Sequence, residues 1–432
     1  IDARTAPLRH GFRASVVNAS AQSLTRLMVT CSSGFNDKGW AYAASASLRY
    51  GPNLVVDGVY YNAWGYYLSA EKMFNPNSRL SFTFLGVPTK RGAQMGAVDE
   101  AYELLDNYFY NPNWGYQTNE DSYDPGYSYA KGRGGLFDFL DQRNARVRDY
   151  HEPVAIANYT HDFSENTKLS AAASFRFGNN GYSALDWYKG ADPKPDYYRN
   201  LPSYQQVRVM EWETNQPIIE QDKHDIQASY WNQNYQGVSQ IDWRSLYNFN
   251  YNMKNMGADP SGMPVGRAYY IISERHTDQR DFNVNANLQH TFNRHSSING
   301  GASFRFNRTE YYQTVKDLLG GDYFLNVDNF ADRDDASGGA GNDESGRWTW
   351  NDTNEATLQQ RMKGEGDKDG YDYYGFTQTA KLWATYTFQK GPWGAQAAVE
   401  GGFTSIHREG LFKKGLFEDN SYGKPEKKRF PS

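Results

Sequence analysis

The sequence predicts an all-β fold, an antiparallel transmembrane β-barrel, and three observations support this prediction. First, aromatic residues make up 16% of the 432 residues, yet the hydrophobic fraction is only 39% and the mean hydropathy is −0.82. A soluble chain this polar would have difficulty burying so many rings. A barrel removes the conflict, because only alternate strand residues face lipid. The other two observations are a repeated strand–turn–strand unit and a marked inequality between short turns and long loops.

The strand–turn–strand unit recurs at a constant offset. Segment His161–Phe177 matches His290–Phe306, and both contain Ala-Ser-Phe-Arg-Phe. In each copy apolar residues alternate with small or polar residues, which is the period of a strand with one apolar face. A short polar turn, Ser164–Thr167 in the first copy, separates the strands, and Phe74–Leu80 keeps the same spacing. Each copy therefore predicts a β-hairpin.

The same alternation predicts about eleven strands along the chain. The clearest case is Phe282–Gln289, where apolar residues occupy one face and Asn or Gln the other. Aromatic residues near the start of the fourth strand fit an interfacial girdle. The strands are expected at 7–18, 22–33, 40–50, 59–73 and 79–90, in hairpins at about 151–178 and 268–312, and in a last hairpin that ends near 409.

Three long insertions interrupt the strands, at about 91–149, 180–266 and 313–373. They are rich in aromatic residues, Gly and Asp, and a short helix is expected around Asp242–Tyr247. Short turns at one end and long loops at the other are the topology of outer-membrane barrels, whose long loops are extracellular.

Several functional classes receive no support from the sequence. A net charge of −5 and a pI near 6.0 do not mark a nucleic-acid-binding protein. No run of about 18 apolar residues predicts a helical membrane span. The eight histidines form no HExxH motif or Cys/His cluster, and the acidic stretch Asp332–Asp335 lacks EF-hand spacing. We therefore predict no metal site, no cofactor and no enzymatic activity.

Six segments in order carry a resemblance to a known family. They are Tyr67–Lys72, Gly86–Gly92, Asn111–Gln117, Asn144–Pro153, Leu185–Tyr188 and Val315–Tyr323. Together they resemble TonB-dependent outer-membrane receptors of the Bacteroidetes, over nearly the whole chain. The resemblance implies a barrel of about 22 strands, plugged by an N-terminal globular domain. We therefore expect residues 1–432 to be the central part of such a barrel, a fragment without the plug domain and the C-terminal strands.

The resemblance also implies a function and partners. The chain would be a fragment of a TonB-energised receptor in the outer membrane, importing a glycan, peptide or metal chelate. The expected partners are TonB, reached through the missing N-terminal region, outer-membrane lipids and a small-molecule or oligomeric nutrient, with a surface lipoprotein as a further candidate. Two alternatives stay open. A passive porin or surface-binding barrel would use the same strands, and a secreted β-rich glycan hydrolase would need a convergent carboxylate pair.

Candidate ligand-binding residues are aromatic side chains of the long loops, which either stack on ligand rings or pack the loops together. They are Trp114, Tyr116, Trp187, Tyr188, Tyr197 and Tyr198. Arg176 and Arg305 fall on the polar face of their strands and are predicted to face the lumen. There they would pair with acidic groups of a plug, or with barrel carboxylates such as Asp162.

Overall fold

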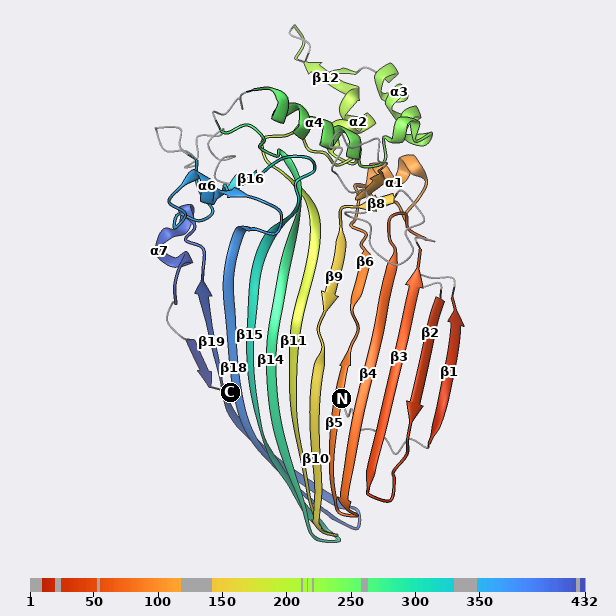
Figure 1. Ribbon diagram of the computed structural model, residues 1–432, viewed down its shortest axis with the longest axis vertical. Coiled ribbons are helices and arrows are strands. Elements are labelled where there is room, and N and C mark those ends of the chain that lie inside the picture. The colour runs from red at the N-terminus through yellow and green to blue at the C-terminus, as the bar shows by residue number, and fades with distance from the viewer. Residues whose placement is uncertain are drawn as a thin grey trace.

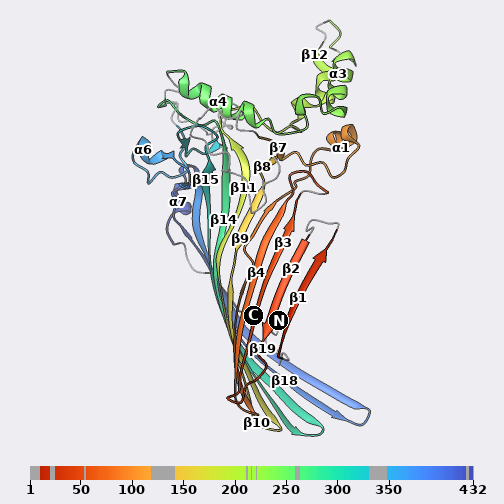
Figure 2. The ribbon, with the colours of Figure 1, turned by 45° about the vertical axis from the view of Figure 1, so that its right-hand side comes forward.

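The computed structural model is dominated by one large antiparallel sheet with loops and helices at one end (Figure 1). It describes residues 10–19, 25–52, 55–117, 142–210, 213–215, 217–219, 221–257, 263–329, 348–424 and 428–431. The sheet has 14 strands in the order β1-β2-β3-β4-β5-β10-β11-β14-β15-β18-β19-β20, with β6 beside β4 and β9 beside β11. It twists and curves along its length, as Figure 2 shows.

The strands of this sheet differ greatly in length. They are β1 (Gly11–Asn18), β2 (Thr25–Ser32), β3 (Trp40–Gly51), β4 (Tyr61–Asn75), β5 (Ser78–Gly86), β6 (Thr89–Gly92), β9 (Val147–His151), β10 (Val154–Ser164), β11 (Thr167–Trp187), β14 (Tyr270–Asn293), β15 (Ser296–Asp317), β18 (Lys368–Lys390), β19 (Trp393–Gly410) and β20 (Lys428–Pro431). The eleven predicted strands are all present among them, so the all-β prediction is confirmed.

The remaining elements lie in the long loops and near the C-terminal end. The helices are α1 (Asp99–Leu105), α2 (Pro202–Gln206), α3 (Gln221–Asn232), α4 (Trp243–Asn255), α6 (Leu358–Arg361) and α7 (Glu418–Ser421), with 3-10 turns η2 (Tyr198–Asn200), η3 (Tyr235–Gly237) and η4 (Gly415–Phe417). Small strand pairs join β7 (Trp114–Tyr116) to β8 (Gln142–Asn144), β12 (Val207–Met210) to β13 (Pro217–Ile219), and β16 (Phe324–Leu325) to β17 (Met362–Lys363). Within the described ranges, no helix is long and apolar enough to cross a membrane.

Apolar side chains of neighbouring strands line up on one face of the sheet. Phe282 of β14 lies opposite Phe175 of β11 and Phe306 of β15, and Leu288 lies opposite Leu169. Strand residues alternate between faces, so these pairings extend one apolar surface across several strands. We call this surface the apolar band and the opposite surface the polar face. The predicted grouping of the Phe282–Gln289 side chains onto two faces is confirmed.

The two copies of the repeated hairpin have the same register. His161 pairs with Leu169 across β10 and β11, and His290 pairs with Ile298 across β14 and β15. In both hairpins the register shifts just before the turn, and β4 and β5 shift at the same place. The sequence repeat is therefore a structural repeat.

Three short turns are built in the same way. In each, a side-chain oxygen at the first turn position accepts a hydrogen bond from the backbone amide two residues later, which favours a tight turn. The bonds run from the Asn77 amide to Asn75 Oδ1 (2.9 Å), from the Asn166 amide to Ser164 Oγ (3.2 Å) and from the His295 amide to Asn293 Oδ1 (2.8 Å).

These turns also bond to one another around the edge of the sheet, which we call the turn rim. Each turn offers a carbonyl oxygen to a backbone amide of the next hairpin. The amides of Asp162, Thr291 and Gln389 donate to the carbonyl oxygens of Asn77, Asn166 and His295, over 2.8, 2.8 and 2.7 Å. Successive hairpins are thus joined by a repeating backbone contact.

The strands extend further toward the long loops than the alternation predicts. β11 continues to Trp187 and β15 to Asp317, while β18 already begins at Lys368. These residues fall inside the intervals expected as insertions at about 180–266 and 313–373. Beyond the apolar band both faces carry polar and aromatic residues, so the alternation is lost although the backbone pairing continues.

One glycine lets β11 change its partner. β11 pairs with β10 up to Arg176 and with β9 from Asn179 onward. Gly178 lies between these positions with φ of 139°, and a Cβ there would come within 2.0 Å of the His151 carbonyl oxygen. Only glycine fits this conformation and this close approach.

The loop end of the molecule contains its apolar cores. The predicted helix near Asp242–Tyr247 is present as the longer α4, and Asp242 caps it by accepting a bond from the Ser245 amide (2.9 Å). Its Trp243, Leu246 and Tyr247 are buried in one core. That core also contains Ala145, Ile241, Tyr269, Tyr270, Ile272 and Leu319. The loops therefore pack as an ordered layer on the strand ends.

Candidate functional site

A polar pocket lies on the polar face near the loop end. It has a volume of about 340 Å³ and is lined by Asp186, Trp187, Arg275, Gln313, Phe324, Val327, Asp328, Asn329, Asn351, Asp369, Gly370, Tyr371 and Lys414. Arg275, Gln313 and Asp369 lie directly opposite one another on β14, β15 and β18. Arg275 and Asp281 are an even number of residues apart on β14, so this row belongs to the polar face. The pocket has the size of a small-molecule site.

Asp369 is the most deeply buried acidic group of the pocket, with 2% of its surface exposed. Its Oδ2 accepts a hydrogen bond from Gln313 Nε2 (3.1 Å), whereas Oδ1 has no hydrogen-bond partner among the described residues. Burial raises the pKa of this carboxyl to about 7, and the nearby charge of Asp186 acts in the same direction. The side chain lies beyond the apolar band, where the strands extend toward the loops. A donor inside the pocket would satisfy its free oxygen.

A bulge in β18 shapes the floor of the pocket. The register between β15 and β18 shifts at Gln313, leaving Gly370 and Tyr371 as extra residues. Gly370 has φ of 70°, and its amide donates to Asn326 Oδ1 (3.0 Å). The bulge holds Tyr371 in the pocket lining.

Lys414 is fixed on the other side of this bulge. Its Nζ donates to the Gly370 carbonyl oxygen (2.9 Å) and to Asn351 Oδ1, and lies 3.5 Å from a carboxylate oxygen of Asp328. Burial lowers the pKa of the Lys414 amine, and the Asp328 carboxylate opposes this shift. These contacts hold the Lys414 amine in place in the pocket lining.

Arg275 is the exposed cation of the pocket. Within the part of the chain that the structure describes, its guanidinium has no hydrogen-bond or ion-pair partner. A guanidinium presents donors in a planar fork that matches a carboxylate. The arrangement can therefore hold a ligand group with two acceptor oxygens.

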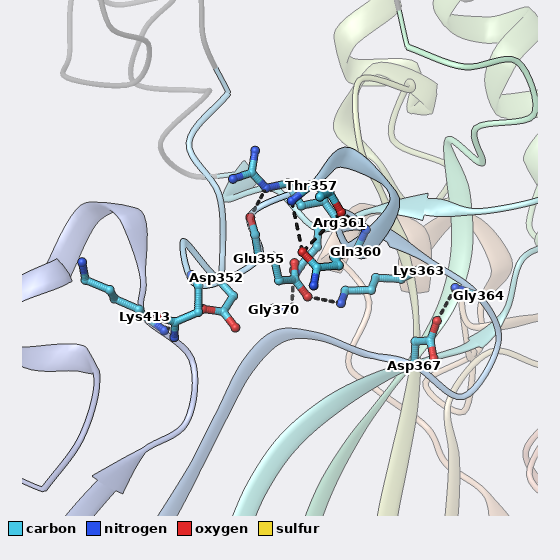
Figure 3. A network of polar contacts seen from close by, with 12 residues as sticks. Asp352, Glu355, Thr357, Gln360, Arg361, Lys363, Gly364, Asp367, Gly370 and Lys413 are labelled. Carbon is cyan, nitrogen blue, oxygen red and sulfur yellow. Dashed lines mark hydrogen bonds and ion pairs between the residues drawn. The ribbon is translucent and has the colours of Figure 1, made fainter.

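A second polar network holds the segment that follows the pocket residue Asn351 (Figure 3). Glu355 accepts from Lys363 Nζ and, through its backbone carbonyl, from Arg361 Nε (2.9 Å). Asp352 accepts from the Lys413 amide (3.0 Å), next to the pocket residue Lys414. Thr357 and Gln360 form a capping box at the start of α6. The segment next to Asn351 is therefore held at several points, although it contains little regular structure.

The structure disperses the six predicted aromatic residues, and only Trp187 lines the pocket. Trp114 and Tyr188 are each 5% exposed; Tyr188 packs in a core with its ring 5.6 Å from Trp348. Tyr116 and Tyr198 are about half exposed. The Trp114 and Tyr116 rings are 5.2 Å apart, and those of Tyr197 and Tyr198 are 4.6 Å apart. Ligand binding by these residues stays a prediction; the buried ones pack the loops.

Arg176 and Arg305 converge on one carboxylate of the polar face. Arg305 binds Asp281 through two nitrogens, at 2.7 and 3.1 Å, and Arg176 Nη2 lies 3.6 Å from the same carboxylate. Asp281 is 4% exposed. Asp162, named as a possible partner, lies next to the turn of its hairpin instead, so the acceptor is a different barrel carboxylate. The lumen-facing role of these arginines stays a prediction.

Sequence reasoning missed Arg275, Asp369 and Lys414. Gln313 and Asp369 fell inside the interval expected as a loop, and Lys414 follows the last predicted strand. The one available signal is the Asp369-Gly370 pair, because such dipeptides mark a turn or bulge. This dipeptide predicts where a strand is interrupted, but it does not predict which residues of the adjacent strands lie beside it.

Comparison with known proteins identifies the fold through structure. The chain matches no protein-family model and no curated protein sequence. Among solved structures, the ferric citrate transporter FecA in its unliganded form has a TM-score of 0.50 and 8% identity, covering 99% of this chain and 42% of that one. The fold of this chain is therefore similar to part of the fold of that transporter.

Two further solved structures give similar values. The closed form of the ferric-catecholate import receptor Fiu from E. coli K12 has a TM-score of 0.49 and 12% identity, covering 98% of this chain and 46% of that one. The copper transporter OprC has a TM-score of 0.47 and 7% identity, with 99% and 42% covered. The chain thus spans less than half the length of each of these proteins, all of which are receptors or transporters rather than enzymes.

Proposed function

We propose that this chain forms part of an outer-membrane receptor that imports a nutrient with energy from TonB. The observation that carries the proposal is the apolar band together with the barrel-type sheet. On β14 the band extends over the 11 residues from Phe282 to Phe292, and a transmembrane β-strand needs about 9–11 residues. The strand portions beyond it and the long loops then project from the membrane surface.

The remaining parts of the proposal follow from the likeness to receptors of this fold. The plug domain and further strands would belong to the same receptor outside residues 1–432, and TonB would bind through the N-terminal part. Outer-membrane lipids would contact the apolar band. A surface lipoprotein and an origin in the Bacteroidetes are proposed on the sequence resemblance described above.

Cysteine labelling tests the orientation. Cys31 is exposed, so it is first replaced by Ser. In that background Asp222→Cys places a thiol on α3 at the loop end, and Asn166→Cys places one in a short turn. A membrane-impermeant maleimide applied to intact cells should label position 222, and position 166 only after the outer membrane is permeabilised. Labelling of both positions in intact cells would contradict the proposed topology.

A transport assay separates the receptor from a passive porin. Growth on the imported nutrient should require both this protein and TonB, because a plugged barrel opens only when energised. If uptake through the protein continues at the same rate in a strain without TonB, the porin alternative is correct.

A further inference from the structure

We propose that the pocket on the polar face binds a short peptide, with the peptide carboxylate on Arg275 and its terminal ammonium on Asp369. The inference rests on the proposed function, since it names the class of nutrient that the receptor would take. Both residues belong to the row that crosses β14, β15 and β18, and neither has its hydrogen-bonding capacity filled by the described protein.

The cationic end of the row is available for an anion. Arg275 is exposed and lines the pocket, while the pocket's other cation, Lys414, is engaged by Gly370, Asn351 and Asp328. A guanidinium binds a carboxylate through two parallel hydrogen bonds. The anionic group of a ligand would therefore be directed to Arg275.

The acidic end of the row is available for a donor. Asp369 keeps Oδ1 unpartnered inside a nearly closed environment, and burying a polar group without a partner costs free energy. Asn329 Oδ1 lines the same pocket and also has no partner in the described residues. Asp369 and Asn329 thus each bring one unpartnered acceptor to the pocket lining, and an ammonium group has three donors to offer them.

The spacing favours a peptide over a single amino acid. Arg275 and Asp369 are separated by two strand spacings, roughly 10 Å between their backbones. An extended chain spans about 3.3–3.6 Å per residue. Two to three peptide residues therefore bridge the two ends, and the Trp187 and Tyr371 rings would contact the side chains between them.

The same groups disfavour the other nutrient classes. A neutral glycan would leave the guanidinium and the carboxylate without charged partners, at the cost of their desolvation. An anionic metal chelate would face three carboxylates, Asp186, Asp328 and Asp369, against two cations. The cationic Arg275 and the acidic Asp369, at opposite ends of the row, match the carboxylate and the ammonium of a zwitterionic ligand.

The test measures binding of four probes to the full-length protein purified in detergent, by isothermal titration calorimetry. The probes are trialanine, N-acetyl-trialanine, trialanine amide and maltotriose. Trialanine should bind, each blocked peptide should bind at least ~10-fold more weakly, and maltotriose should not bind. The variants are Arg275→Gln and Asp369→Asn, with Arg280→Gln as a control on the opposite face of β14.

The variants test which residue binds the carboxylate of the peptide and which binds its ammonium group. Arg275→Gln should weaken trialanine but should abolish the difference between trialanine and its amide, because the carboxylate has lost its partner. Asp369→Asn should likewise abolish the difference between trialanine and the acetylated peptide, and Arg280→Gln should change nothing. Preserved discrimination in both variants would overturn the proposal, even if affinity fell.

Two results distinguish this proposal from the proposed function. Binding of maltotriose without binding of trialanine overturns the peptide assignment and leaves the import receptor intact. Failure of the cysteine-labelling pattern in intact cells overturns the receptor function, whatever the purified protein binds.

Discussion

Replacing Leu288 by Arg tests the assignment of the two sheet faces. Leu288 lies in the apolar band opposite Leu169 of β11 and is 46% exposed. Within the stretch Phe282–Phe292 it occupies a position near the centre, and therefore near the membrane midplane. A cation on the lipid-facing side at this depth costs ~2–4 kcal/mol, which corresponds to a ~30- to 700-fold change in the folding equilibrium.

Asn285→Arg is the matched control on the same strand. Asn285 lies on the polar face, opposite Ala172 of β11 and Ser303 of β15. An arginine there would reach water or other polar groups, so we expect a change within ~0.5 kcal/mol. Phe175→Arg, at the upper part of the band opposite Phe282, should resemble Leu288→Arg but with a smaller cost, because the cost falls toward the interface.

The assay is folding of the full-length protein into lipid vesicles at increasing urea concentration, followed by tryptophan fluorescence and by resistance to protease. Assembly in cells is compared by the amount of each variant in the outer-membrane fraction. If Leu288→Arg and Asn285→Arg fold with the same urea midpoint, the faces have been assigned wrongly. A larger loss for Asn285→Arg would show that they are reversed.

Three further predictions concern single groups. Arg305→Ala leaves the buried Asp281 with the hydrogen bond from Asn283 Nδ2 (3.0 Å) and the longer contact to Arg176. The free energy of unfolding should therefore fall by ~1.5–3 kcal/mol. Adding Asp281→Asn should recover part of this loss, and urea titration measures both changes. Burial holds the pKa of Asp369 near 7, above that of an unfolded Asp, so the folded protein alone keeps the proton between about pH 4 and 7. Stability should therefore decrease as pH rises through this window, and thermal unfolding of Asp369→Asn should lack this decrease. Asp242→Ala removes the cap of α4 and should destabilise that helix by ~0.5–2 kcal/mol. Amide hydrogen exchange should then be faster in α4 and unchanged in the strands. Equal exchange rates in α4 of both proteins would mean that the capping bond contributes nothing.

The strands could be predicted because a two-residue period is a local property. Phe282–Gln289 alternates cleanly since one side meets an apolar environment and the other does not, and the repeat of His161–Phe177 reinforces the pattern. Beyond the band this constraint disappears. Tyr182, Arg275 and Gln313 pair across neighbouring strands, but nothing in their own segments alternates between apolar and polar.

The pocket could not be predicted, because its residues meet only through the register of separate strands. Arg275, Gln313 and Asp369 are distant in sequence, and a shift of one residue in either pairing would move a side chain to the other face. The bulge at Gly370 adds a further offset that no periodicity reveals. The aromatic content predicted ligand binding at Trp114 and Tyr188, but both are buried in loop packing, which depends equally on long-range contacts.

The turn rim bears on how such a chain grows, both during assembly and over evolution. Because each completed turn presents a carbonyl oxygen at the same place, an arriving hairpin meets an acceptor that already fixes its register. Each hairpin is therefore aligned by the hairpin directly before it and needs no contact with more distant ones. A gene duplication of one hairpin would therefore insert a unit that fits both neighbours. The number of strands in the sheet can change in this way, while the hydrogen bond between each turn and the next hairpin stays the same.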